Sequence, residues 1–551
     1  MKRLLTLSIA AIFMSCTPSS NDEAIKLITK EKLNERVAKL SSDEFEGRAP
    51  STNGGTKAID YIVSEYKKIG LKPINGSYTQ DLAMVKYGKI VKKSSVSIKN
   101  GRKNFKLRAD LGKDDDNFGF WATDMKPTSD VKNAEIVYVG YGVEAPEHGW
   151  DDFKGMDVKG KILLMLNNDP QVMKDGKLDP DYFKGETRTY YGRWTYKFEQ
   201  AMKHGAAGAI LVHTTASAGY GYKILGSSGL ETHYTVNLPG AGFQLPFAAH
   251  ADSLLSNEIA KTVGKTLPEF FAMANRKDFQ PIKTKLRLTS HIETEVSSVT
   301  TSNIYGVVEG TDPELKKQHI VFSAHYDHKG IHAGEDSIFN GAWDNASGTS
   351  SIMNLAEAYV KNPTKRSMIF LACAAEESGS LGSLYFAGKS PLPLNQIVAD
   401  INIDMPNVHG KSRDIAVVGV NSNSIGDILK EEAKKVMVDG TPLLATDDPN
   451  PNAGLFYRSD QVNFAKKGIP ALFVMSGVDY IGRDRSWSDE KNKEVYHQAS
   501  DEIDKDWDLS GLVRDMKMIY SVGQRVGNNP EQPKWHSGNE FETPYNALYK
   551  K

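Results

Sequence analysis

Cysteine is scarce in this chain: its 551 residues include only Cys16 and Cys373. Cys373 lies in the apolar run MIFLACAAEE, which predicts a small buried side chain and gives no sign of a catalytic cysteine. The chain also lacks a basic excess, because its net charge is −1. That balance gives no support for a nucleic-acid surface or for membrane attraction by bulk charge. Hydrophobic content of 40% and charged content of 25% are ordinary for a globular protein.

The apolar run at the N-terminus, residues 4–14, is too short to span a bilayer and follows two basic residues, as in a secretory signal. It ends at Cys16, after the small residue Ser15, and resembles a bacterial lipoprotein signal, in which the cysteine becomes the lipidated first residue. We therefore expect export, with a membrane anchor on Cys16 in the periplasm or at the cell surface. An ordinary signal peptide with an incidental cysteine is the alternative. If Cys16 is lipidated, no intramolecular disulfide can form.

The length of the chain predicts two or more domains. After residue 300, short buried strands alternate with helices, which predicts an α/β fold with a mainly parallel central sheet flanked by helices. Residues 56–69 predict a helix, with Gly70 as its C-cap. The region of about 112–290 has a different pattern, which is rich in predicted strands. The expected divisions are a signal at 1–16, the N-terminal part of the main domain at 17–111, an inserted β-rich domain at 112–290, the rest of the main domain at 291–527 and a tail at 528–551.

Metal-ligating side chains stand where the predicted strands end. Parallel sheets place ligand sites at the carboxyl ends of their strands, so these side chains should gather at one edge. Each taken alone has an ordinary explanation as a turn, a cap or a solvated group, but their convergence indicates a metal site. The candidates, in the segments AHYDHKG, GAWDNASG, MIFLACAAEE, IVADINID and VYHQASDE, are His325, Asp327, Asp344, Glu376, Glu377, Asp404 and His497.

Two imidazoles, several carboxylates and no thiolate favour a catalytic zinc site over a structural one. The ligands suffice for two zinc ions, as in the two-metal sites of aminopeptidases and phosphatases. His328 and His332 lie in the same stretch as His325. We interpret both as solvated side chains or as groups behind the ligands.

The order His-x-Asp, Asp-Asn-Ala-Ser-Gly, Glu-Glu, Asp-Met and Tyr-His resembles that of the M28 zinc metallopeptidases. The resemblance covers about residues 290–525 and the helix at 56–69, and the segment EFEGRAPSTNGGTKAIDYI is similar to the N-terminal segment of that family. It implies a zinc-exopeptidase fold and the following roles. Asp344 bridges two zinc ions, His325 and Asp404 complete one ion, Glu377 and His497 complete the other, Glu376 is the general base, and Asp327 orients His325.

The region of about 112–290 resembles a protease-associated (PA) domain, through YVGYGV, DVKGKILLM and AMKHGAAGAILV. In related enzymes such an insert shapes access to the active site. The segment RSDQVNFAKKGIPALF also resembles the family, which often has His where this chain has Gln461. Beside it, Tyr457 could donate a hydrogen bond to a developing oxyanion, although a packing role is the alternative.

The expected function is therefore that of an exported zinc aminopeptidase that acts on peptides. One alternative is a single-zinc acyltransferase like the glutaminyl cyclases, which share this fold. The other is a non-catalytic surface binding protein on a peptidase scaffold, although such relatives typically lose ligands and none is missing here. Peptides are the expected partners and nucleic acids are not, and the sequence carries no signal for an oligomeric state.

Overall fold

The computed structural model describes residues 20–108, 117–219, 221–222, 233–238, 241–332 and 337–550. The predicted signal at 1–16, with Cys16, lies outside the described residues, and so does the expected boundary at 111/112. Within these ranges, no helix combines the length and the apolar character needed to cross a membrane.

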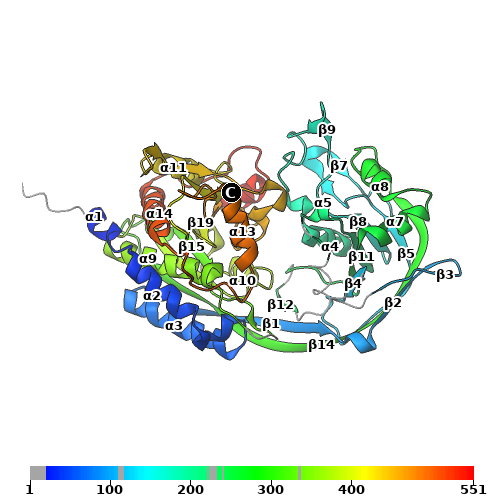
Figure 1. The fold of residues 1–551 in the computed structure, drawn as a ribbon, viewed down its shortest axis with the longest axis horizontal. Coiled ribbons are helices and arrows are strands. Elements are labelled where there is room, and N and C mark those ends of the chain that lie inside the picture. The colour runs from blue at the N-terminus through cyan, green and yellow to red at the C-terminus, as the bar shows by residue number, and fades with distance from the viewer. Residues whose placement is uncertain are drawn as a thin grey trace, which may run out of the picture.

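One sheet runs through both halves of the molecule, and the long strand β14 (Ile282–Val308) joins them (Figure 1). On one side of β14 the strand order outward is β18 (Ser367–Cys373), β15 (His319–His325), β19 (Ile397–Ile403), β24 (Ala471–Val474), β20 (Asp414–Val418) and β23 (Leu444–Thr446). On the other side it is β5 (Thr128–Tyr138), β8 (Ile162–Leu166), β11 (Gly208–Val212), β13 (Ala248–Ala251) and β4 (Phe118–Trp121).

The central strands of the first half are parallel, as the sequence predicts. β15 pairs in parallel with both β18 and β19, and β19 pairs in parallel with β24. Every residue of β15, β18 and β19 is buried, which explains why these strands are apolar runs instead of alternating patterns. Their carboxyl ends therefore open onto one edge of the sheet.

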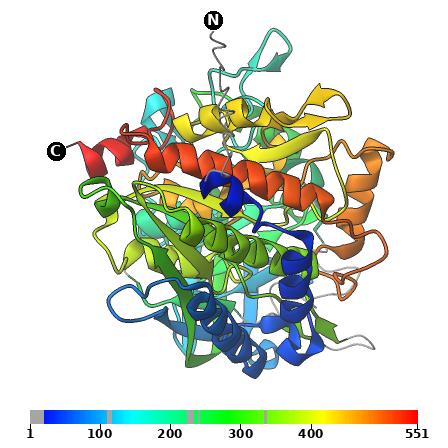
Figure 2. The same ribbon diagram turned by 90° about the vertical axis from the view of Figure 1, so that its left-hand side faces the viewer.

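Helices cover both faces of this half of the sheet. Successive strand residues point to opposite faces, so they pack against different helices. Phe322 packs into a large core with α2 (Lys30–Leu40), α3 (Asn53–Ile69), α9 (Ser347–Lys361) and α14 (Ser510–Asn528), while Val321 packs into a separate cluster with Phe386 and Phe464. Those two phenylalanines belong to α10 (Leu381–Gly388) and α12 (Gln461–Ala465). Figure 2 shows α14, α9, α2 and α3 together on the face turned to the viewer.

The predicted helix at 56–69 is confirmed as the C-terminal part of α3. Gly70 caps it in the left-handed conformation, with φ 95. The helix begins earlier than expected, at Asn53, because the Thr52 side chain accepts a hydrogen bond from the backbone N–H of Gly55.

The region expected as an insert has a core of its own, in which strands and helices are mixed. β5, β8, β11 and β13 pair in parallel in that order, and β4 closes the edge antiparallel to β13. The helices α4 (Trp194–Lys203), α7 (Ser253–Lys261) and α8 (Leu267–Ala274) lie with this sheet (Figure 1).

β14 belongs to both halves at once. Its first part pairs with β5 and β2 (Ser95–Asn100), and its second part pairs with β1 (Thr79–Lys89) and β18. The expected boundary at 290/291 therefore falls inside a continuous strand, and the two halves are joined by backbone hydrogen bonds as well as by the chain.

The C-terminal tail packs against the main domain. Trp535 and Phe541 are buried in a small cluster with Tyr457 and Val462, and α15 (Glu542–Tyr549) follows. The Trp535 indole N–H donates to the carbonyl oxygen of Gly468 at 3.0 Å.

Candidate metal centre

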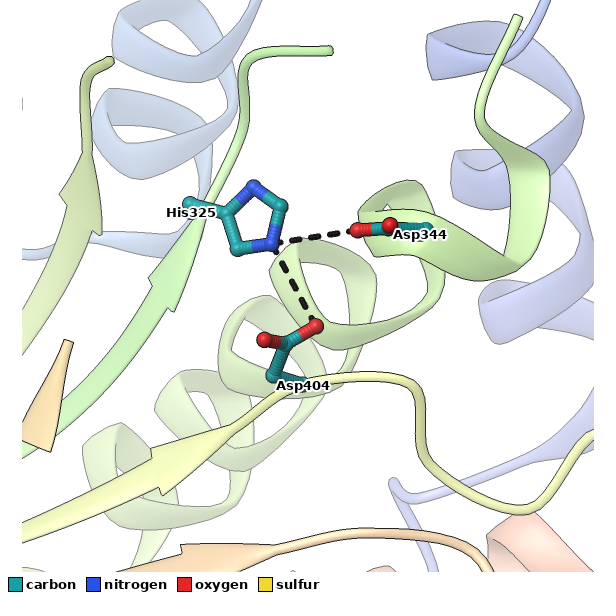
Figure 3. A group of neighbouring side chains, drawn as sticks. All are labelled: His325, Asp344 and Asp404. Carbon is teal, nitrogen blue, oxygen red and sulfur yellow. Dashed lines mark hydrogen bonds and ion pairs between the residues drawn. The ribbon is translucent and has the colours of Figure 1, made fainter. Parts of the chain in front are cut away.

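Strand ends bring the predicted ligands to one edge of the sheet. β15 ends at His325, β19 ends one residue before Asp404, and Glu376 lies in the turn that follows β18. Asp344 comes from the segment before α9. Figure 3 shows His325, Asp344 and Asp404 converging from three separate elements.

His325, Asp344 and Asp404 form a first group with the geometry of a metal site. The His325 Nε2 atom lies 3.2 Å from Asp344 Oδ1 and 3.3 Å from Asp404 Oδ1 (Figure 3). All three residues are buried. Burial alone would lower the pKa of His325, but the two carboxylates raise it well above its usual value. This nitrogen therefore sits where a cation is favoured.

Asp344 also takes part in a second group, with Glu377 and His328. The His328 Nδ1 atom lies 2.7 Å from Glu377 Oε1. His497 Nε2 approaches the same two carboxylates, at 3.0 Å from Glu377 Oε2 and 3.4 Å from Asp344 Oδ2. The Lys329 Nζ atom lies 2.9 Å from Glu377 Oε2. Asp344 thus faces both groups, with one oxygen toward His325 and the other toward His497.

The protonation of this second group is set by its crowded charges. Burial raises the pKa of Glu377, but His497, Lys329 and His328 together hold it well below its usual value. Burial disfavours the charged form of His497, yet Glu377 and Asp344 raise its pKa to about 9. The group therefore combines an ionised carboxylate with positive partners.

The adjacent residues Glu376 and Glu377 diverge. Glu376 turns toward the first group, with its Oε2 atom 4.0 Å from His325 Nε2, and accepts a hydrogen bond from the Ser380 hydroxyl at 3.1 Å. Burial raises the pKa of Glu376 well above its usual value, despite the opposing effect of His325. Two neighbours in sequence thus have opposite protonation tendencies, and Glu376 is the one suited to exchange protons.

Asp327 contacts the expected partner, His325, through its backbone, and its carboxylate has a second set of partners. The contact to His325 Nδ1 at 3.2 Å comes from the backbone carbonyl oxygen of Asp327, while its carboxylate lies 3.9 Å away. That carboxylate accepts the backbone N–H groups of Glu376 at 2.9 Å and Glu377 at 3.3 Å. The residue thus orients the histidine through its main chain and fixes the Glu-Glu turn through its side chain.

Two further groups were missed by sequence reasoning. Asp501 accepts the backbone N–H groups of Trp343 at 2.8 Å and Asp344 at 2.9 Å, as Asp327 does for the glutamates. The Ser459 hydroxyl donates to Asp404 Oδ2 at 2.8 Å. Asp501 stands four residues after His497, and this proximity was the only available signal.

The expectations for the other histidines, for Gln461 and for Cys373 have different outcomes. His328 is buried against Glu377, so it is not solvated, and its Nε2 atom has no hydrogen-bond partner within the described part of the chain. His332 is exposed, as expected. Gln461 is buried and structural: it accepts from the Asn402 amide at 2.9 Å and donates to the carbonyl oxygen of Phe456. Cys373 is a buried free thiol, as expected.

Tyr457 lies at the junction with the inserted region. Its hydroxyl donates to Glu540 Oε1 at 2.6 Å, and its ring lies 5.9 Å from that of Tyr190, measured between centroids. The Lys184 Nζ atom reaches the same Glu540 oxygen at 2.6 Å. An oxyanion role would require the hydroxyl to leave Glu540, so that role stays a prediction.

A comparison with known families finds one model that matches the part of the chain containing this centre. Residues 303–520 match the family model described as Peptidase family M28. The match covers less than half of the chain, and residues 303–520 are called the M28 segment below. It contains every member of both groups, together with Glu376, Asp327 and Asp501. The N-terminal helices and the inserted region lie outside the M28 segment.

Individual proteins are similar to this chain in sequence or in fold. Aminopeptidase YwaD of Bacillus subtilis (strain 168) is 27% identical over 213 residues, which are 37% of this chain and 40% of the relative. The aminopeptidase from Aneurinibacillus sp. strain AM-1 has a similar fold, with a TM-score of 0.51 and 18% identity, over 93% of this chain and 97% of the solved one. A zinc aminopeptidase from Bacillus subtilis, BSAP, aligns with a TM-score of 0.44 and 16% identity over 91% of this chain and 96% of its own.

Replacing Tyr457 by Phe separates its two possible roles. The change removes a buried hydrogen bond to a carboxylate, so Tyr457→Phe should lower the free energy of unfolding by about 1.5–3 kcal/mol. Urea denaturation measures this. Tyr66→Phe is the matched control, because the buried Tyr66 hydroxyl has no hydrogen-bond partner among the described residues, and it should cost little. We expect turnover of an aminoacyl chromogenic substrate to change less than about tenfold. A fall of about 10²–10³ would assign the oxyanion role instead.

Proposed function

We propose that this chain is a zinc-dependent aminopeptidase that removes N-terminal residues from peptides. The observation that carries the proposal is the pair of buried ligand groups that share Asp344 at the edge of the parallel sheet. The match of residues 303–520 to the model of Peptidase family M28 supports a peptidase, and the name of the relative YwaD supports an aminopeptidase. An acid-rich site also suits the free α-ammonium group of such a substrate.

The donor set fits two zinc ions. Imidazole nitrogens and carboxylate oxygens are ordinary zinc ligands, and neither group contains a thiolate. His325 and Asp404 would hold one ion, Glu377 and His497 the other, and Asp344 both. The buried His328, whose Nδ1 atom lies 2.7 Å from Glu377 Oε1, adds a donor to the second group. Bound zinc would supply an acidified water and polarisation of the scissile carbonyl.

Glu376 would move the proton. Its raised pKa and its place beside the first group suit a base that takes a proton from the attacking water and returns it to the leaving amine. The Asp327 carboxylate would hold Glu376 in place by accepting the backbone N–H of Glu376. Ser380 would limit the rotation of the Glu376 carboxylate through the hydrogen bond to Oε1.

The inserted region, which we propose to be a PA-like domain, would limit the length of peptides that reach the site. The Arg188 backbone N–H donates to the carbonyl oxygen of Pro451 at 3.0 Å, and Lys184 pairs with Glu540. The first contact joins the insert to the segment before Tyr457, and the second joins it to the C-terminal tail. Peptides would then reach the centre between the insert and the C-terminal part of the chain, which these contacts hold together.

A substrate panel tests the function directly. The purified protein should release free N-terminal residues from short peptides and from aminoacyl chromogenic substrates, and should leave N-blocked peptides intact. Turnover should fall as the peptide is lengthened. A chelator should abolish turnover, and zinc should restore it as the metal content reaches two ions per chain. One zinc per chain with cyclised N-terminal glutamine as the product would favour the acyltransferase instead, and metal binding without any turnover would favour a binding protein.

The two adjacent glutamates give a sharper test of mechanism. Glu376→Gln keeps the size of the side chain and removes the base, so both zinc ions should stay bound while kcat falls by about 10²–10⁴. Glu377→Gln weakens a ligand, so about one zinc per chain should be lost, and excess zinc should restore part of the activity. Metal analysis and steady-state kinetics measure both. Loss of zinc from the Glu376 variant, with retention by the Glu377 variant, would reverse the two roles.

We also propose that Cys16 carries a lipid anchor after export. The support is the sequence of the N-terminal signal, because these residues lie outside the described structure. Cys16→Ala should move the protein from the membrane fraction to the soluble fraction, because two acyl chains are needed for stable attachment. Fractionation with an immunoblot measures this. A wild-type protein that is already soluble after export would contradict the anchor.

A further inference from the structure

Arg48 is a fully buried arginine behind the metal centre, and it lies outside the M28 segment. It ends a short 3₁₀ stretch, Asp43–Arg48, between α2 and α3. Its guanidinium donates to four backbone carbonyl oxygens. These are Tyr326 at 2.7 Å, Leu40 at 2.6 Å, Asn340 at 2.5 Å and Gly341 at 2.9 Å.

Three of these carbonyls belong to the loops that carry the ligands. Tyr326 directly follows His325, and Asn340 and Gly341 precede Asp344. A single planar group therefore spans the backbone of the two ligand loops and attaches both to the end of α2. The fixed fork of the guanidinium makes this possible, since a lysine ammonium has only three donors on one atom.

The charge of Arg48 matters as well as its shape. Asp327 and Asp501 each accept two successive backbone N–H groups from the turns that carry Glu377 and Asp344. Burial lowers the pKa of Arg48 to about 10, and the carboxylates of Asp501, Asp327, Asp344 and Glu377 oppose this effect. Arg48 thus stays protonated at neutral pH, as a buried cation facing the acids of the centre.

We propose that Arg48 is a positioning residue that sets the spacing of the His325 and Asp344 loops and thereby the affinity of the centre for zinc. This inference rests on the proposed zinc site. Arg48 does not touch the metal or the substrate: it acts through the backbone of the two loops and through the carboxylates of Asp327 and Asp501. An N-terminal segment outside the M28 segment therefore completes the centre.

The chain offers a matched control in Arg366. It too is buried, and it donates to the backbone carbonyl oxygens of Val526 at 2.9 Å, Glu531 at 3.3 Å and Pro530 at 3.4 Å. It stands before β18, at the end of that strand opposite to Glu376 and Glu377. A purely structural role for Arg48 would make the two arginines equivalent.

The experiment compares Arg48→Lys with Arg366→Lys in the full chain. Zinc affinity is measured by competition with a chromophoric chelator, and stability by thermal unfolding of the metal-free proteins. Both variants should lower the midpoint of unfolding. Only Arg48→Lys should weaken zinc binding, by about 10–100-fold, the usual effect of losing a group that orients metal ligands. Excess zinc should restore much of its kcat, whereas the zinc dependence of Arg366→Lys should match that of the wild type.

Asp501→Asn tests the same support from its other end, and it decides the matter if Arg48→Lys does not fold. It keeps the shape of the side chain but removes its charge and one of the two oxygens that accept the Trp343 and Asp344 N–H groups, so its zinc affinity should also fall by about tenfold or more. Wild-type zinc affinity in a folded Arg48→Lys or Asp501→Asn variant would overturn the proposal. An unmodified protein that binds no zinc would instead overturn the proposed function.

Discussion

Carboxylates crowd together at the carboxyl edge of β15, β18 and β19, and most of the local structure serves to compensate their negative charge. Asp344, Glu377 and Asp404 face this space directly, and Asp327 and Asp501 lie behind them. Buried charges of one sign are costly unless hydrogen bonds or cations oppose them. The protein opposes them with backbone N–H groups, with histidines, with Lys329 and with Arg48. The proposed zinc ions would add further positive charge at this edge.

The same kind of contact compensates and positions the carboxylates at two of the ligand turns. Asp327 binds two N–H groups of the Glu376–Glu377 turn, and Asp501 binds two N–H groups at Asp344. Each ligand turn is therefore held by a carboxylate that does not itself belong to either ligand group. Since a shift of about 1 Å at such a site can cost catalysis heavily, these contacts matter as much as the ligands they position. Arg48 then links the loops to the N-terminal helices.

Much of this arrangement could be predicted from the sequence, because local patterns determine it. The apolar runs of β15, β18 and β19 predict buried parallel strands, and the rule for strand ends then gathers His325 and Asp404 at one edge. The helix cap at Gly70 is equally local. The structure brings these side chains together, although their roles toward zinc stay predictions.

The rest depends on partners that are distant in sequence. Arg48 binds carbonyls that stand 278 to 293 residues further along the chain, and backbone acceptors leave no mark on the sequence. His328 is buried because the loop at Gly341 covers it, which its polar surroundings in AHYDHKG do not indicate. The strand β14 continues across the expected boundary at 290/291 because its first part pairs with β5 and its second part with β1, and both partners are distant in sequence.

The most direct test of the central claim is the anomalous diffraction of crystals of the zinc-loaded protein, recorded on both sides of the zinc edge. We predict two zinc peaks separated by about 3.5–4 Å, the usual two-metal spacing. One peak should lie between His325, Asp344 and Asp404, and the other between Asp344, Glu377 and His497. A single peak, or two peaks that do not share Asp344, would contradict it.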